Sequence, residues 1–235
     1  MTFIVVNFIF IILIFLISAV IARILIPRIL LISLRKKLFD IPDDRKVHKR
    51  AIPRLGGVSF FPTTLFAFCL VYTFRLLGGD SVSTLYASYL LPELLLFACG
   101  MTLLYLTGIA DDLVGVRYRQ KFVIQIFCAC LFPLSGLWIN DLYGLFGIHE
   151  LSVYVGIPFT ILTVVFITNA INLIDGIDGL ASGLSSVALL IFTFLFIEKG
   201  LWSYAMLAAG TFGVLVPFFY YNVFGSVELS LIHIS

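Results

Sequence analysis

Four acid or amide side chains lie close together in one short stretch of an otherwise apolar chain. The stretch reads Asn169-Ala-Ile-Asn172-Leu-Ile-Asp175-Gly-Ile-Asp178-Gly-Leu-Ala-Ser-Gly183. Residues three apart are neighbours on a helix surface, so Asn169 lies beside Asn172, and Asp175 lies beside Asp178. Because glycine adopts conformations that other residues avoid, the glycine after each aspartate predicts that the helix opens there, with backbone close to a ligand. Such a site suits a phosphate group together with a divalent cation.

Two adjacent carboxylates, Asp111 and Asp112, stand at the end of another apolar run. They belong to the segment Gly108-Ile-Ala-Asp111-Asp112-Leu-Val-Gly115-Val-Arg117-Tyr-Arg119-Gln-Lys121. An ionised group at bilayer depth costs about 2.5–3.5 kcal/mol on insertion scales, so it is usually functional or paired. Two interpretations stay open: the basic residues of this segment neutralise the pair, or a divalent cation with oxygen ligands relieves its repulsion. The Asn and Asp stretch favours the second, with magnesium as the cation and manganese as the alternative.

A cationic loop precedes both acidic segments. It reads Asp40-Ile-Pro-Asp43-Asp44-Arg45-Lys46-Val-His48-Lys49-Arg50-Ala-Ile-Pro53-Arg54-Leu-Gly56-Gly57. Anionic lipid headgroups would account for many of its charges. Pro53 and the closing glycine pair, however, would fix the backbone where a substrate could approach, and arginine binds phosphate in a bidentate manner. Arg45, His48 and Arg54 are therefore predicted to bind a substrate.

The composition excludes a soluble globular domain. Of the 235 residues, 61% are hydrophobic and 12% are charged, and the mean hydropathy is +1.14. These values predict an all-α fold, a polytopic transmembrane helical bundle. Apolar runs long enough to cross a hydrocarbon core of about 30 Å predict seven spans, at residues 3–26, 55–76, 89–110, 121–139, 153–170, 182–198 and 201–221.

The basic residues are distributed unevenly over the loops between these spans. Successive loops lie on alternating sides of the membrane, so every second loop shares one side. The loops of one side and the adjoining span ends hold 13 of the 15 Lys and Arg residues: Arg23, Arg28, Arg35, Lys36, Lys37, Arg45, Lys46, Lys49, Arg50, Arg54, Arg117, Arg119 and Lys121. Lys and Arg accumulate in short cytoplasmic loops, which predicts that these loops are cytoplasmic and that the N-terminus lies outside. The same alternation puts all the aspartates of the two acidic segments on the cytoplasmic face.

Together the three segments resemble the polyprenyl-phosphate N-acetylhexosamine-1-phosphate transferases of glycosyltransferase family 4. The matching pieces are Asp43-Asp44-Arg45-Lys46-Val47-His48 with Ile52-Pro53-Arg54-Leu55-Gly56-Gly57, then Gly108-Ile-Ala-Asp111-Asp112, then Asn169-Ala-Ile-Asn172-Leu-Ile-Asp175-Gly-Ile-Asp178-Gly-Leu-Ala. They occur in the family's order. The first piece resembles the WecA/TagO-like branch, which uses UDP-GlcNAc or a close relative, whereas the branch that uses UDP-MurNAc-pentapeptide has a different glycine-pair loop.

The resemblance implies a reaction at the cytoplasmic face of a bacterial inner membrane. UDP-N-acetylhexosamine and undecaprenyl phosphate would give undecaprenyl-diphosphate-N-acetylhexosamine and UMP, with magnesium, as the start of lipopolysaccharide, teichoic acid or other cell-wall glycan synthesis. It implies no nucleic-acid partner and is compatible with a homodimer in the lipid bilayer. Asp111, Asp112 and Asp175 would be catalytic and hold the metal. The other matched residues would bind substrate: Arg45, His48, Lys49, Arg54, Asn169, Asn172 and Asp178.

The chain departs from the family pattern near its end. Family members continue past the seventh span with a Phe-Met-Gly-Asp-x-Gly-Ser motif and later a His-rich loop, and neither follows Tyr220-Tyr221-Asn222-Val-Phe-Gly225 here. Residues 229–235 resemble the translation of a sequencing-library transposon adaptor. We therefore expect one transmembrane domain over residues 1–228, incomplete at its C-terminus, a non-native tail at 229–235, and a fragment without activity of its own.

A transporter that couples to ions or protons through its aspartates is the main alternative. Transporter acids tend to lie near the bilayer midplane in broken helices. The aspartates here fall at the predicted span ends, which favours the transferase.

Overall fold

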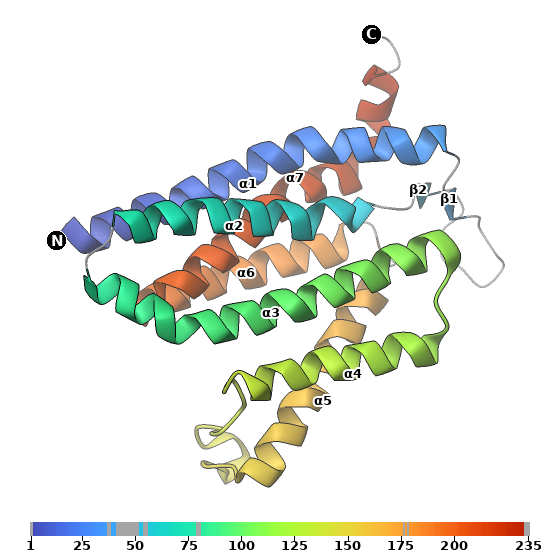
Figure 1. Ribbon diagram of the computed structural model, residues 1–235. Helices are drawn as coiled ribbons and strands as arrows, with labels where there is room; N and C mark the ends of the chain where they lie inside the picture. Colours follow the sequence, from blue (N-terminus) through green and yellow to red (C-terminus); the bar gives the residue numbers. More distant parts are fainter. Residues whose placement is uncertain are drawn as a thin grey trace. The chain divides into compact units, whose positions relative to one another are not determined.

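A computed structural model describes residues 2–36, 39–40, 52–53, 56–78, 81–175, 177 and 179–232. Over these ranges the fold is all-α, as predicted (Figure 1). Seven α-helices make up most of it: α1 (Thr2–Arg35), α2 (Phe60–Leu77), α3 (Ser81–Val114), α4 (Tyr118–Leu134), α5 (Val153–Ile174), α6 (Leu180–Glu198) and α7 (Trp202–Ile232). The other elements are the 3₁₀ helices η1 (Gly56–Ser59) and η2 (Leu145–Gly147), and the antiparallel strands β1 (Phe39–Asp40) and β2 (Ile52–Pro53).

Six of these helices are long and apolar enough to cross a membrane, which makes the protein a multi-pass membrane protein. The exception is α4. Its 17 residues extend over about 26 Å at 1.5 Å per residue, slightly less than a typical hydrocarbon core. The predicted span ends at residue 139, five residues past the observed end of this helix at Leu134. Ser135 ends it, because its N–H and its hydroxyl both donate to the Phe132 carbonyl, and Gly136 follows with a φ of +90°.

Other predicted helix boundaries were wrong as well, and α7 extends to Ile232 rather than ending at residue 221. Helix α1 continues past Pro27 to Arg35 rather than ending at residue 26, because the residues after the proline are again mostly apolar. The predicted loop 77–88 is mostly helical, since α3 begins at Ser81. The polar first turns of α3 carry no hydropathy signal, although a helix outside the hydrocarbon core does not need one. Helix α5 reaches Ile174 rather than 170.

By packing, the chain divides into two compact units, Met1–Gly79 with Ile174–Ser235, and Asp80–Leu173. In the first unit α7 lies against α1, α2 and α6. A buried cluster of Ala22, Ile26 and Val214 fills the space between α1 and α7. The two helices approach closely, because a Cβ on Gly213 would lie 2.5 Å from the Phe15 carbonyl oxygen. Small residues at such contacts are typical of helix packing in membranes.

A buried arginine links α2 to α1 within the first unit. Arg75 and Asn7 are 6% and 2% exposed, and the Arg75 Nε donates to the Asn7 Oδ1 at 2.7 Å. The Asn7 Nδ2 donates in turn to the Phe3 carbonyl at 2.9 Å. The guanidinium also lies over the Tyr72 ring, 5.9 Å from its centroid. Because a buried charge needs polar partners, Asn7 is placed to stabilise Arg75 inside an apolar helix pair.

Replacing Asn7 by leucine is expected to lower the free energy of unfolding by about 1.5–3 kcal/mol, the range for a hydrogen bond to a charged group. Thr73→Val on the same helix as Arg75 is the matched control. Its hydroxyl donates only to the Cys69 carbonyl of its own helix among the contacts described for it, so a change below about 0.5 kcal/mol is expected. Unfolding in mixed detergent micelles measures both variants, and equal stabilities would contradict the role given to Asn7.

The second unit consists of α3, α4 and α5. Gly115, with a φ of +77°, reverses the chain between α3 and α4, which pack together. After α4 the chain returns to α5 through a loop whose Ile139 N–H donates to the Thr160 hydroxyl at 2.8 Å. Gly156 allows this close approach, because a Cβ there would lie 2.5 Å from the Trp138 ring. The three helices therefore alternate in direction, and the end of α3 meets the start of α4 and the end of α5.

Candidate functional site

An open polar pocket of about 390 Å³ lies where these three helix ends meet. The end of α3, the turn after it, the first two turns of α4 and the last two turns of α5 supply its lining: Asp111, Val116, Tyr118, Lys121, Phe122, Gln125, Asn169 and Asn172. The pocket brings together Asp111 with Asn169 and Asn172, which the sequence analysis assigned to one site. It thus places a carboxylate, an ammonium group and three amides around one space.

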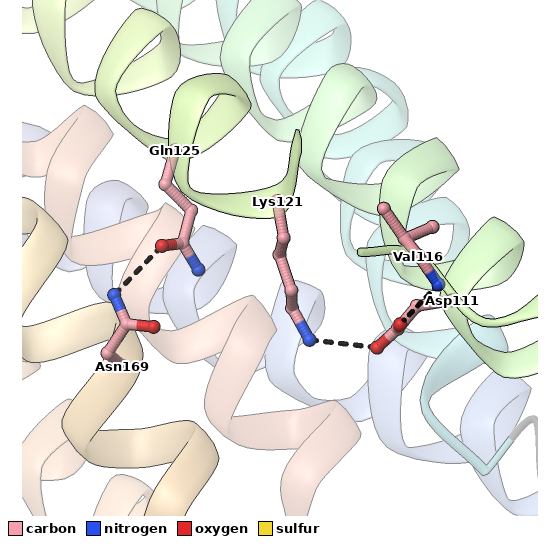
Figure 2. A network of polar contacts seen from close by, with 5 residues as sticks. All are labelled: Asp111, Val116, Lys121, Gln125 and Asn169. Atoms are coloured by element: carbon pink, nitrogen blue, oxygen red, sulfur yellow. Dashed lines mark hydrogen bonds and ion pairs between the residues drawn. The ribbon is translucent and has the colours of Figure 1, made fainter. Parts of the chain in front are cut away.

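Asp111 is held by both of its carboxylate oxygens (Figure 2). Its Oδ2 accepts from the Lys121 Nζ at 2.8 Å, and its Oδ1 accepts from the Val116 N–H at 3.0 Å. The Asp111 carbonyl also accepts from the Gly115 N–H, which closes the last turn of α3. Asp111 thus pairs with a basic residue of its own segment, as one of the two open interpretations predicted. Asp112, next to it, is half-buried.

Asn169 is held from two sides. Its Nδ2 donates to the Val165 carbonyl one turn earlier on α5 and to the Gln125 Oε1 on α4, both at 2.8 Å. Asn172, one turn further on, is exposed to the pocket. Gln125 was not among the residues predicted for the site. It could have been found as the one amide that follows Lys121 by four residues in an apolar helix, since such residues share a face.

Asp175 directly follows α5 and belongs to the first unit. The helix opens here as predicted, because α6 begins only at Leu180, after Gly179 with a φ of +76°. A Cβ on Gly179 would lie 2.5 Å from the Val223 side chain on α7, so both the backbone and the packing require glycine. The Asp175 side chain is exposed on one side, and desolvation by the protein around it raises the pKa of its carboxyl above the ordinary value.

Some predicted site residues lie outside the described ranges. They are Arg45, His48, Lys49, Arg54 and Asp178. Asp111 and Asp175 belong to different units, so their meeting at a shared cation stays a prediction.

The donor atoms of the polar pocket fit magnesium in type. Mg²⁺ prefers oxygen ligands, keeps several waters, and is commonly held by one or two carboxylates plus substrate phosphates. The carboxylate of Asp111 and the amide groups of Asn169 and Asn172 would offer oxygens of this kind. Among the residues with described placement, no three His, Cys, Asp or Glu side chains form a cluster that could hold a metal alone. A cation here would therefore need oxygens from its substrate and from water.

Fold and pocket together define a multi-pass helical membrane protein with a polar site at one end of a three-helix unit. Residues 94–227 match the profile of glycosyl transferase family 4, and the chain belongs to this family. The match covers more than half of the chain. It includes α4, α5, α6 and the part of α3 that carries Asp111.

Curated relatives agree with this assignment. A Bacillus subtilis protein named "Probable undecaprenyl-phosphate N-acetylglucosaminyl 1-phosphate transferase" is 31% identical over 67% of this chain and 40% of its own length. The undecaprenyl-phosphate alpha-N-acetylglucosaminyl 1-phosphate transferase of Yersinia pestis is 28% identical over 82% of this chain and 49% of its own. A phospho-N-acetylmuramoyl-pentapeptide-transferase of Staphylococcus carnosus is 30% identical over 72% of this chain and 52% of its own length. The chain thus spans about half the length of these relatives.

Proposed function

We propose that this protein transfers N-acetylhexosamine-1-phosphate, with GlcNAc as the sugar, from a UDP-sugar to undecaprenyl phosphate. The reaction takes place at the cytoplasmic face of a bacterial inner membrane, releases UMP and starts the synthesis of a cell-envelope glycan. One observation carries the proposal: Asp111 and Asn169, far apart in the sequence, line a single pocket in a chain of this family. The names of the relatives in Bacillus subtilis and Yersinia pestis support undecaprenyl phosphate as the acceptor.

The chemistry requires alignment of two phosphates more than a strong base. A phosphate monoester has a second pKa near 6, so the lipid phosphate is mostly a dianion at neutral pH. One of its oxygens attacks the sugar-bearing phosphorus of the UDP-sugar, and the bond from that phosphorus to the UMP oxygen breaks. Phosphoryl transfer of this kind depends on positioning and on stabilising the charge. Magnesium held by carboxylates would supply that stabilisation.

The residues of this chain would then act mainly by placing groups. Asp111 and Asp112 would hold the cation and align the lipid phosphate, and Asp175, in the turn after α5, is the third acid proposed for the reaction. The Lys121 ammonium pairs with the Asp111 carboxylate. It thereby lowers the cost of keeping a carboxylate at a membrane surface. Asn169 and Asn172 would face the nucleotide.

The direct test is release of UMP from UDP-GlcNAc and undecaprenyl phosphate in magnesium-containing proteoliposomes. Because the relatives are about twice as long, both this chain and the complete reading frame of its gene are assayed. Competition with UDP-GalNAc and UDP-MurNAc-pentapeptide identifies the sugar. Cation or proton flux without any UMP release would favour the transporter instead, although Asp111 and Asp175 lie at helix ends rather than mid-helix.

A further inference from the structure

Gln125 on α4 is a buried amide in a mostly apolar helix. It is 5% exposed and lines the polar pocket. It also lines a neighbouring apolar cavity, whose other walls include Gly100, Cys128 and Thr168. Gln125 is the one residue that the two linings share. It therefore lies at the boundary between the polar site and the apolar interior of this unit, where an amide needs a defined polar partner.

The hydrogen bonds of Asn169 fix the direction of its amide. The Val165 carbonyl can only accept, so the Asn169 atom bonded to it must be Nδ2. The same Nδ2 meets Gln125, so Gln125 must present its oxygen, Oε1. With both partners placed on the Nδ2 side, the Asn169 Oδ1 points away from them. Figure 2 shows it directed toward the side of the pocket that carries Lys121 and Asp111.

Helix α4 thus holds the two helices beside it through residues four positions apart. Lys121 binds Asp111 of α3, and Gln125 binds Asn169 of α5. Residues at this spacing lie on one face of a helix. The Val165 carbonyl alone would leave the amide free to pivot about that single contact. The second contact, from Gln125, removes this freedom and presents the Asn169 oxygen as a fixed acceptor.

We infer that Gln125 is a positioning residue for the sugar nucleotide. By fixing the Asn169 amide, it keeps the Asn169 Oδ1 available as an acceptor for a hydrogen-bond donor of the UDP-sugar, such as a hydroxyl or an N–H group. The inference rests on the proposed function and adds to it a residue from α4. In this inference Gln125 affects substrate binding, whereas a purely structural amide would only form hydrogen bonds that stabilise the fold.

Gln125→Met, which keeps the length of the side chain but removes the acceptor, tests this in the complete reading frame. The KM for UDP-GlcNAc is expected to rise about 3- to 10-fold, the equivalent of one hydrogen bond, with the KM for undecaprenyl phosphate unchanged. Gln125→Glu keeps an acceptor oxygen for the Asn169 amide, so its KM for UDP-GlcNAc is expected to stay close to that of the wild type. Gln120→Met is the matched control, because Gln120 is exposed on the same helix, and it is expected to leave both constants unchanged.

A double-mutant cycle separates positioning from a structural role. If Gln125 acts through Asn169, then Gln125→Met adds nothing to the KM of Asn169→Ala, because the group it positions is already gone. A merely structural role predicts that the two effects add and that both substrate KM values rise together. If Gln125→Met does not fold, Gln125→Asn replaces it, since its amide is one methylene too short to reach Asn169.

The outcomes distinguish the inference from the proposed function. If the wild type neither releases UMP nor gains thermal stability with UDP-GlcNAc, the proposed function fails, and the inference fails with it. If the wild type is active and Gln125→Met has an unchanged KM for UDP-GlcNAc, the inference alone fails.

Discussion

Asp111→Asn in the complete reading frame is expected to lower kcat for UMP release by at least about 10²-fold. Asp111 uses both carboxylate oxygens, one for the Lys121 ammonium and one for the Val116 N–H. Asparagine replaces one of these two oxygens by an NH₂ donor, which would face one of the two donors. It also carries no negative charge and so holds a cation less strongly. Glu150→Gln in the loop between α4 and α5 is the control, since Glu150 is an exposed carboxylate, and full activity is expected.

The pH dependence of this variant decides what Asp111 does. If Asp111 aligns phosphates through a cation, the loss is similar from about pH 6 to about pH 9, because the lipid phosphate is ionised over most of that range. If it is an obligatory base, activity returns at high pH, where no proton need be removed. Full recovery of the activity of Asp111→Asn at about pH 9 would therefore contradict the alignment mechanism. Thermal unfolding of the same variant shows whether the lost contacts to Lys121 and Val116 destabilise the protein and so contribute to the loss of activity.

The sequence predicts the helices of this protein better than their ends. Hydropathy locates the seven helices because each is mostly apolar, although α4 is too short to be one of the six candidate membrane spans. It misses the polar start of α3, since a helix that leaves the hydrocarbon core needs no apolar residues. The predicted end of α1 at residue 26 was wrong for another reason, because the residues after Pro27 are again mostly apolar. The opening of the helix after Asp175 was predicted correctly. There, one of the two requirements for glycine is local, namely the positive φ of Gly179.

The sequence predicts those site residues that carry a charge or an amide group within an otherwise apolar stretch. Asp111, Asn169 and Asn172 stand out in the sequence and share one pocket. Gln125 gives only a weak signal, its place four residues after Lys121 in an apolar helix. Its role comes from a contact with Asn169, 44 residues later in the chain. No local pattern contains such a pairing. The choice between ion pair and metal for Asp111 was also open, since both use the same carboxylate and Lys121 lies within reach only in the folded unit.

Gly213→Ala is expected to destabilise the first unit by about 1–3 kcal/mol or more, the cost of adding a methyl group to a packed contact. The new Cβ would lie 2.5 Å from the Phe15 carbonyl oxygen and 3.1 Å from the Ser18 Cβ. The nearest of these atoms is backbone, which cannot rotate away, so α1 and α7 would have to separate. The small residues Ala205, Ala209 and Gly213, each four positions after the one before, signal such a contact in sequence.

Glycine-to-alanine substitutions at two other positions are expected to have smaller effects on stability and serve as comparisons. At Gly210 a Cβ would meet side-chain atoms rather than backbone, with Ile14 at 3.1 Å and the Ser18 Oγ at 3.5 Å. Side chains can shift, so Gly210→Ala should cost less than Gly213→Ala. At Gly108 in α3 nothing lies within 4 Å, so Gly108→Ala should be neutral or stabilise by about 0.5–1 kcal/mol, since alanine favours a helix more than glycine does. Unfolding of this chain in detergent gives all three values. A Gly213→Ala variant as stable as Gly108→Ala would show that α1 and α7 do not pack this closely.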